Sequence, residues 1–331
     1  MDVAKGIAIV LVVGFHAVVF PANLGLAQQW RGLASVLDTF RMPLFFFTSG
    51  LFAAKAAHGP LLHLWSTRVA RLLWLFVLWS VIWFVVFYAA PPLGTSRIGQ
   101  RLDELALLFI SPNQNTWYVY ALAVYFLVAW ALRRLPAAIQ IGLAAVLAVS
   151  IDTGLLNATN GAVDRMGQGL VWFMVALHFG PQVRALAPRV RWWHAVLALL
   201  VYGLCAGLVD VAGVKGVPFV RLALAALAVL AGCTIAIIIS RVTALDWVRA
   251  LGRRTLGVYL VHFYVILGVC LLLAPVAAQV AQWRALDLML PVLLIALAVS
   301  VSLAVRHLTR GLPWLWDRPR RRRSEVTPAV R

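Results

Sequence analysis

The sequence predicts an all-α polytopic membrane protein with about ten transmembrane helices, and three observations support this class. Hydrophobic residues make up 63% of the 331 residues and charged residues only 12%, with a mean hydropathy of +0.92. Soluble domains, in contrast, are roughly a quarter charged. Apolar blocks of about 17–25 residues, the length that a helix needs to cross a bilayer, recur from end to end. These blocks do not alternate in polarity, so neither an open sheet nor a β-barrel is expected.

Ten apolar segments are predicted to span the membrane within one domain, residues 1–310, with no soluble domain attached. They cover about residues 4–20, 35–54, 70–90, 115–132, 136–151, 166–182, 193–209, 218–240, 255–273 and 286–305. The basic segment 311–331 is expected to form a disordered cytoplasmic tail. An apolar N-terminal segment is also typical of a secretory signal, but the further spans favour a first transmembrane helix.

Positive charge is distributed unevenly between the two sides of this span map. Of the 29 Lys and Arg residues, 21 fall on the side of the N-terminus and 8 on the opposite side. Because cytoplasmic loops are enriched in Lys and Arg, both termini are predicted to be cytoplasmic. The net charge of +18 therefore reflects topology, and nucleic acid is not expected as a partner. The basic tail either serves topology alone or also contacts anionic membrane lipid.

The three cysteines give no indication of a metal site. Cys205, Cys233 and Cys270 all lie within apolar blocks, at spacings too long for a metal-binding motif. We interpret them as small packing residues and expect no metal cofactor.

The first predicted span carries one lysine and one histidine in an otherwise apolar run, AKGIAIVLVVGFHAVVF. Eleven helical steps put His16 about 16 Å from Lys5 and only about 20° away around the helix, so both lie on one face. Both side chains could therefore line one passage into the protein. Lys5 would attract an anion at its cytoplasmic mouth, and His16 would act as a base inside the membrane. The alternative is that Lys5 is a positive-inside anchor and His16 a packing histidine.

The segment FRMPLFFFTSGLF places Arg41 and Pro43 inside the second predicted span, where ionisable residues are costly and default to functional candidates. Proline removes a helical hydrogen bond and bends a helix around a cavity, and the Ser49-Gly50 pair permits close helix approach. We predict that Arg41 faces such a cavity. A kinked packing helix is the alternative.

Two further regions carry candidate residues. Arg68 and Arg71 stand at i, i+3 before the third span, where paired guanidinium groups suit either phosphate recognition or positive-inside anchoring. Tyr259 and His262 stand at i, i+3 about two turns into the ninth span. Trp117, together with the tyrosine that follows it, is typical of an interfacial aromatic belt.

Taken together, DVAKGIAIVLVVGFH, FRMPLFFFTSGLF, RVAR, TWYVYAL and LGRRTLGVYLVH closely resemble motifs of the acyltransferase 3 family, in the family's order. The resemblance covers nearly the whole chain, about residues 1–310. It implies an O-acyltransferase of the bacterial inner (plasma) membrane with about ten spans. Such proteins modify carbohydrates and other extracytoplasmic acceptors.

The family's basic-residue-x10-His pattern falls on Lys5 and His16, so the resemblance implies that His16 is the catalytic histidine. Its Arg-x-x-Arg pattern falls on Arg68 and Arg71, which together with Lys5 would hold coenzyme A. Lysine stands where the family more often has arginine. The larger members carry a glutamate that TWYVYALAVYF lacks, and no esterase-like domain follows the last span. The chain therefore resembles the compact, stand-alone branch.

The resulting hypothesis is transfer of an acetyl or other short acyl group from acetyl-CoA, or another acyl-CoA, to a carbohydrate or glycolipid hydroxyl outside the cytoplasm. His16 would remove the hydroxyl proton as the oxygen attacks the thioester carbonyl. Arg41 would stabilise the oxyanion or position the acceptor, restrained by Asp38 one turn away. The other candidates are expected to line the acceptor cavity, namely Ser49, Trp117, Tyr259 and His262.

A secondary transporter or flippase for a polar or glycan-linked substrate is the alternative from a different class. Ion-coupled carriers usually place carboxylates near mid-membrane, and none of the 11 acidic residues is central on this span map. No inverted repeat is evident either, so an enzyme is favoured. The sequence carries no signal for the acceptor, the length of the acyl group or the oligomeric state.

Overall fold

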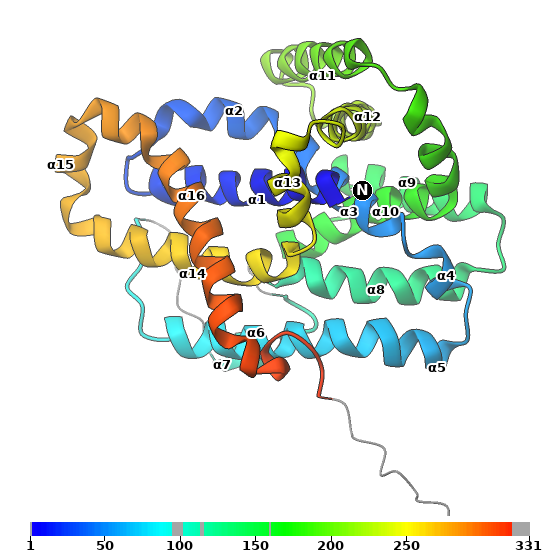
Figure 1. The fold of residues 1–331 in the computed structure, drawn as a ribbon, viewed down its shortest axis with the longest axis horizontal. Helices are drawn as coiled ribbons and strands as arrows, with labels where there is room; N and C mark the ends of the chain where they lie inside the picture. Colours follow the sequence, from blue (N-terminus) through cyan, green and yellow to red (C-terminus); the bar gives the residue numbers. More distant parts are fainter. Residues whose placement is uncertain (1, 95–101, 113–115, 159, 320–331) are drawn as a thin grey trace, which may run out of the picture.

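The computed structural model describes residues 2–94, 102–112, 116–158 and 160–319. Within these residues, ten helices of 13 or more residues occupy the positions of the predicted spans (Figure 1). They are α1 (Asp2–Ala22), α3 (Asp38–Gly50), α6 (Ala70–Phe87), α8 (Trp117–Leu132), α9 (Ala137–Asp152), α10 (Gly161–Leu186), α11 (Trp192–Ala212), α12 (Val220–Ile239), α14 (Thr255–Leu273) and α16 (Arg284–Leu308). Shorter helices connect them, namely α2 (Arg31–Val36), α4 (Ala54–Ala57), α5 (Leu61–Leu64), α7 (Leu102–Ala106), α13 (Asp246–Gly252) and α15 (Ala277–Gln282). The predicted all-α class is confirmed.

Not all ten helices are long enough to cross a bilayer alone. Seven segments of the described chain have the length and the apolar composition to do so: Asp2–Ala22, Leu61–Phe87, Gly161–Arg189, Trp192–Ala212, Val220–Ile239, Thr255–Gln282 and Arg284–Gly311. α8 and α9 have 16 residues each, and α3 has 13. Because 13 residues rise only about 20 Å against ~30 Å of hydrocarbon, ten full spans stay a prediction. The polytopic membrane class itself is confirmed.

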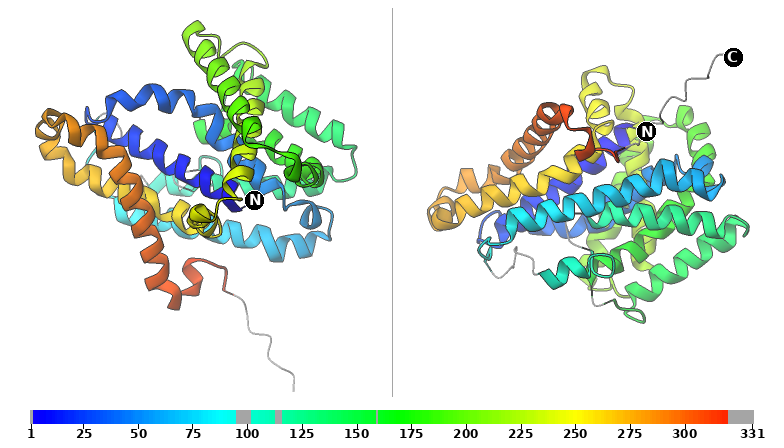
Figure 2. Two further views of the ribbon diagram at one scale, coloured as in Figure 1. Left: turned by 45° about the horizontal axis from the view of Figure 1, so that its top comes forward. Right: turned by 90° about the horizontal axis from the view of Figure 1, so that it is seen from below.

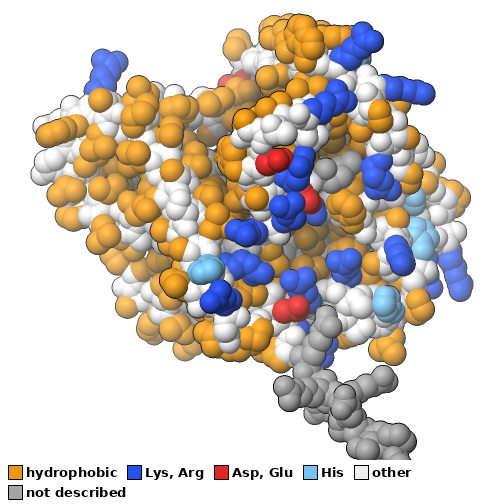
Figure 3. Space-filling model, in the orientation of Figure 1, with side chains coloured by type: hydrophobic (Ala, Val, Ile, Leu, Met, Phe, Trp, Pro, Cys, Tyr) orange, Lys and Arg blue, Asp and Glu red, His pale blue; other side chains and the backbone are white. Residues whose placement is uncertain are grey.

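Large apolar side chains cover the outside of the bundle. On α11, a stripe at helical spacing, Leu197, Leu200, Leu204 and Leu208, is 54–66% exposed. The space-filling view in Figure 3 shows extensive hydrophobic surface over the end of the molecule where α15 lies. In water such a surface would be unfavourable, whereas lipid tails solvate it.

α1 is the central helix of the bundle. It packs against α3, α12, α13, α14 and α16, and the views in Figures 1 and 2 agree that it runs through the interior. Alanine and glycine occupy much of its buried surface, including Ala4, Gly6, Ala8 and Ala17. Small side chains let the neighbouring helices approach closely, as is typical of membrane bundles. The helix that carries Lys5 and His16 is therefore contacted from several sides.

The second predicted span is divided into two helices. α2 ends at Val36, and Leu37, with φ −77° and ψ 2°, separates it from α3. Pro43, the expected point of interruption, lies inside α3, which continues through it. A proline removes one backbone donor, and the remaining hydrogen bonds of α3 hold the helix on both sides. The interruption thus lies before the proline rather than at it.

The first residues of the expected disordered tail, 311–331, are folded against the bundle. Short 3₁₀ turns cover Thr309–Gly311 and Pro313–Leu315, and Trp316 is buried against Trp79, with ring centroids 5.3 Å apart. The Trp79 indole donates to the Leu315 carbonyl at 2.9 Å. Aromatic packing therefore holds this segment against α6. The rest of the expected tail, residues 320–331, lies outside the described residues.

Candidate active site

Two histidines from distant parts of the sequence meet inside the bundle. His16 of α1 and His262 of α14 place Nδ1 and Nε2, respectively, 3.1 Å apart. His262 is 1% exposed and His16 is half-buried. The His16 ring also contacts Phe20 and Phe263, at centroid distances of 5.8 and 4.7 Å. The packing of α1 against α14 thus creates an imidazole pair surrounded by aromatic side chains.

The hydrogen-bond partners of His262 indicate which ring nitrogen of each histidine carries a proton. Its Nδ1 lies 3.0 Å from the carbonyl oxygen of Val258 and 2.8 Å from that of Tyr259. Because carbonyl oxygens only accept, Nδ1 of His262 carries the proton and its Nε2 is an acceptor. His16 must then donate from Nδ1, which leaves His16 Nε2 with an unshared electron pair. A neutral histidine in this tautomer is ready to take a proton at Nε2.

A cavity of about 360 Å³ opens beside the histidine pair. Trp117, Tyr259 and several phenylalanines form its apolar wall, and Arg41 and Arg165 supply positive charge. This size and mixed lining are typical of a small-molecule site. The structure therefore brings five of the predicted site residues to one cavity, namely His16, Arg41, Trp117, Tyr259 and His262.

Arg41 is buried on α3 and faces inward, as predicted. Only 6% of the residue is exposed, and its guanidinium carbon lies 3.4 Å from the ring centroid of Phe15. Its Nη2 donates to Asp38 Oδ1 at 2.8 Å, so the expected restraint by Asp38 is present. The side chain is thus fixed by an ion pair and by stacking on an aromatic ring.

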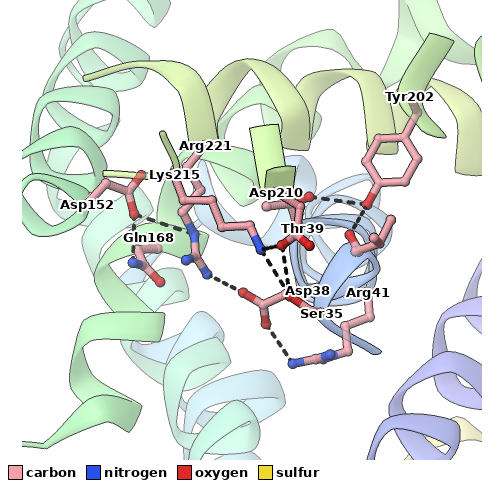
Figure 4. A network of polar contacts seen from close by, with 11 residues as sticks. Ser35, Asp38, Thr39, Arg41, Asp152, Gln168, Tyr202, Asp210, Lys215 and Arg221 are labelled. Carbon is pink, nitrogen blue, oxygen red and sulfur yellow. Dashed lines mark hydrogen bonds and ion pairs between the residues drawn. The ribbon is translucent and has the colours of Figure 1, made fainter. Parts of the chain in front are cut away.

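An extended polar network continues from Arg41 across four helices (Figure 4). The second oxygen of Asp38 accepts from Arg221 of α12 at 2.8 Å. Arg221 Nε lies 3.6 Å from Asp152 at the end of α9, and Gln168 of α10 donates to Asp152 at 2.7 Å. These contacts join α3, α9, α10 and α12 beside Arg41, because each helix contributes a charged or amide side chain to the network.

Ser49 does not lie beside a histidine. Its hydroxyl bonds to the Phe45 carbonyl at 3.0 Å and to the hydroxyl of Tyr118 at 2.6 Å. The backbone N–H of Tyr118 in turn donates to the Tyr259 hydroxyl at 3.2 Å. Ser49 therefore ties α3 to α8, and no base among the described residues lies beside it to make it a nucleophile.

The expected interfacial belt at Trp117 is not found. Trp117 is 7% exposed and Tyr118 is 4% exposed, and the Tyr118 ring stacks on Phe45 at 4.4 Å. The reason is that α8 begins inside the bundle rather than at its surface. Trp117 instead forms part of the cavity wall.

The three predicted donor-binding residues lie apart from the histidine pair. Lys5 is half-buried, with its ammonium 4.7 Å from the Phe52 ring centroid, and Arg68 is exposed in a π-helical turn, Trp65–Val69. Arg71 Nε pairs with Asp317 at 3.3 Å. None of the three lines the His16 cavity. Figure 3 shows Lys and Arg side chains gathered over the region of α13 and the start of α1.

Comparison with known proteins identifies the family. Residues 1–306 match the Acyltransferase domain family, Acyl_transf_3. The chain belongs to this acyltransferase family. No curated protein and no solved structure matches it. The protein is therefore a multi-pass membrane acyltransferase, and the matched region includes every residue of the cavity described above.

Several residues of this candidate site were not predicted from the sequence. Arg165, Arg221 and Asp152 were not singled out, although all three line the polar end of the site. The charge distribution could have identified the two arginines, because only 8 of the 29 Lys and Arg residues fall on the predicted outer side. Arg41, Arg165 and Arg221 are three of those eight. An arginine on the side where Lys and Arg are rare is therefore a candidate site residue, as an ionisable residue within a span is.

Proposed function

We propose that this acyltransferase moves an acetyl or other short acyl group from acyl-CoA to a hydroxyl of an extracytoplasmic carbohydrate or glycolipid. Its expected location is the bacterial inner membrane. The observation that carries the proposal is the assignment of His16 as an Nδ1–H tautomer whose Nε2 is unprotonated beside a cavity. A general base needs such a nitrogen within reach of the proton that it removes.

The chemical step uses His16 twice. Nε2 takes the proton of the acceptor hydroxyl while the oxygen forms a bond to the thioester carbonyl carbon. The tetrahedral intermediate then collapses, the carbon–sulfur bond breaks and the departing thiolate takes the proton from the imidazolium. An ester and free coenzyme A result, with no acyl-enzyme intermediate. Direct transfer agrees with the hydrogen bonding of Ser49, which has tyrosine rather than histidine as its side-chain partner.

Coenzyme A would bind toward the start of α1. Lys5 lies about 16 Å along the helix from His16, a distance that the extended arm of coenzyme A is suited to cross. Arg68 and Arg71 supply planar guanidinium groups, which bind phosphates through paired hydrogen bonds. The contact of Arg71 with Asp317 would have to be shared or exchanged when the donor arrives.

A transfer assay in inverted membrane vesicles tests this function. Radiolabel from acetyl-CoA is expected to appear in a glycan or glycolipid fraction, and His16→Ala should lower transfer by about 10²–10⁴-fold, the usual contribution of a positioned base. His58→Ala is the matched control, because this exposed histidine contacts the Ala54 carbonyl of its own turn and does not line the His16 cavity. Equal amounts of each variant in the membrane would be verified by immunoblotting.

Two outcomes would contradict the proposal. One is transfer by the His16→Ala variant at the wild-type rate. The other is substrate uptake that survives in this variant without any covalent acyl product, as expected of a carrier. Mass spectrometry of envelope carbohydrates from cells with and without the gene would identify the acyl group and the acceptor together.

A further inference from the structure

Arg41 has a hydrogen-bonding group that its own neighbours do not satisfy. Its Nη2 is committed to Asp38, but Nη1 is buried and has no hydrogen-bond partner among the described residues. The residue is 94% buried, since only 6% of it is exposed. A buried donor of a charged group without a partner is unfavourable, so such a group in a native structure points to a ligand or water.

A second, smaller pocket adjoins the His16 cavity at this arginine. It has a volume of about 50 Å³, and its lining shares Arg41, Met42 and Arg165 with the larger cavity. Its other polar walls come from α10 and from the ends of α3, α9 and α12. Such a space holds a few water molecules or one small charged group, but not a second sugar ring.

The described lining of this pocket carries more cationic than anionic side chains. Its described lining holds three guanidinium groups, from Arg41, Arg165 and Arg221, against the two carboxylates of Asp38 and Asp152. Both carboxylates already accept from partners in the network, Asp38 from two arginines and Asp152 from Gln168. Beside them, Nη1 of Arg41 is buried and has no hydrogen-bond partner among the described residues. An anion would supply an acceptor to this group in a lining that is already cationic.

We propose that this pocket binds an oxyanion substituent of the acceptor, the carboxylate of an acidic sugar or the phosphate of a phosphorylated glycan. The substituent lies between Arg41 and Arg165, while the acceptor hydroxyl lies at His16 Nε2 in the adjoining cavity. This inference rests on the proposed function. It makes Arg41 and Arg165 determinants of acceptor specificity, because a neutral sugar leaves Nη1 without its partner.

The test compares native and neutralised acceptor with the full-length protein. The glycan fraction that accepts label from acetyl-CoA is divided into three portions. One is kept, one is treated with carbodiimide and borohydride to reduce carboxylates to alcohols, and one is dephosphorylated with hydrogen fluoride. The wild-type protein should lose at least about tenfold in kcat/KM with one treated portion, and the effective treatment identifies the anion.

Variants separate binding of the anion from a general loss of structure. Arg165→Gln is preferred, because Arg165 is exposed and its replacement should leave the fold intact. It should raise KM for the native acceptor by about tenfold and lower kcat/KM for the native acceptor more than for the neutralised one. Arg41→Lys should show the same selectivity for the native acceptor. Arg31→Gln is the matched control, because Arg31 is exposed and contacts Gln28 outside the pocket.

Three results would overturn the inference. The first is wild-type transfer that is unaffected by both treatments. The second is an equal loss by Arg165→Gln and Arg41→Lys with native and neutralised acceptors, as expected if the arginines stabilise the reaction's own oxyanion. The third is the absence of any label transfer by the wild-type protein, which would remove the proposed function itself. The first two results leave that function standing.

Discussion

A neutral histidine acts as a base only through the ring nitrogen that lacks a proton, and here a second histidine decides which nitrogen that is. The carbonyls of Val258 and Tyr259 fix the proton of His262 on Nδ1, and His262 Nε2 then fixes the proton of His16 on Nδ1. His262 thus acts on the reaction through His16. In the proposed mechanism it is a positioning residue rather than a catalytic one.

Replacing His262 should lower the rate without removing the base. In His262→Leu, the Nδ1 of His16 loses its side-chain acceptor, so the ring and its tautomer are held less firmly. We expect kcat to fall by roughly 10–10²-fold, less than on loss of the base itself. His262→Gln offers an amide oxygen to the same hydrogen bond and should retain more activity. The measurement is kcat for acyl transfer, with the apparent Tm in detergent for each variant.

A purely structural role for His262 predicts a different pattern. The two variants would then lose activity in proportion to their loss of apparent Tm. Leucine would be tolerated at least as well as glutamine, because the site is apolar and 1% exposed.

At the scale of single residues, the sequence identified the unusual side chains but not their partners. His16 and Arg41 stand out because a polar group within an apolar helix is costly unless it has a role. Tyr118 and Arg165 do not stand out in this way. A tyrosine at the start of an apolar helix and an arginine in a polar segment are both ordinary, so their places at the site depend on the packing.

Among the helices, α3 shows how a short element is positioned by close approach. A Cβ on Gly50 would lie 2.3 Å from the carbonyl oxygen of Phe173 on α10 and 2.9 Å from Ala176 Cβ. Only glycine lets the two backbones come so near. The same helix carries Arg41 nine residues earlier, so the contact at Gly50 helps to fix the depth of the guanidinium group. The predicted role of the Ser49-Gly50 pair in close approach agrees with this contact.

Gly50→Ala should therefore destabilise the protein. The added methyl group overlaps backbone atoms that have no room to move, and overpacking of this kind costs about 1–3 kcal/mol. Gly142→Ala on α9 is the matched control, because nothing lies within 4 Å of a Cβ there. Alanine at such an open helical site is expected to stabilise by about 0.5–1 kcal/mol. Apparent Tm in one detergent compares the two variants, and a Gly50→Ala protein as stable as wild type would contradict the packing argument.

Element boundaries were harder to predict than the elements themselves. The break in the second span falls at Leu37 rather than at Pro43, because a proline inside a helix removes one hydrogen bond without ending the helix. The fourth span was predicted to begin at about residue 115, close to the start of α8 at Trp117. The burial of Trp117 was not predicted, since the sequence does not show how far a helix end lies from the surface.

The whole molecule is arranged around α1. Its contacts with α3, α12, α13, α14 and α16 place His16 next to residues from both halves of the chain. The distribution of Lys and Arg further predicts that α1 begins on the cytoplasmic side. On this orientation the donor approaches from the start of α1, and the acceptor approaches from the side of Arg41, Arg165 and Arg221.

Labelling of single cysteines tests this orientation. In a background with the three native cysteines replaced by alanine, an impermeant maleimide should label Lys215→Cys in intact cells. It should label Lys55→Cys only after the membrane is permeabilised. Lys55 is exposed and the Lys215 side chain is 37% exposed, so both sites are accessible. The reverse pattern would contradict the predicted topology and exchange the proposed donor and acceptor sides.

The sequence by itself determined the class of the protein, its helices and the residues that are exceptional within them. It could do so because hydrocarbon demands long apolar helices and makes each polar residue costly, which leaves a signal at every position. Only the tertiary structure decided which of these residues meet. His16 and His262 are 246 positions apart, and their contact depends on the direction in which each side chain leaves its helix and on how α1 packs against α14. The anion pocket at Arg41 likewise exists only because the ends of several helices converge there.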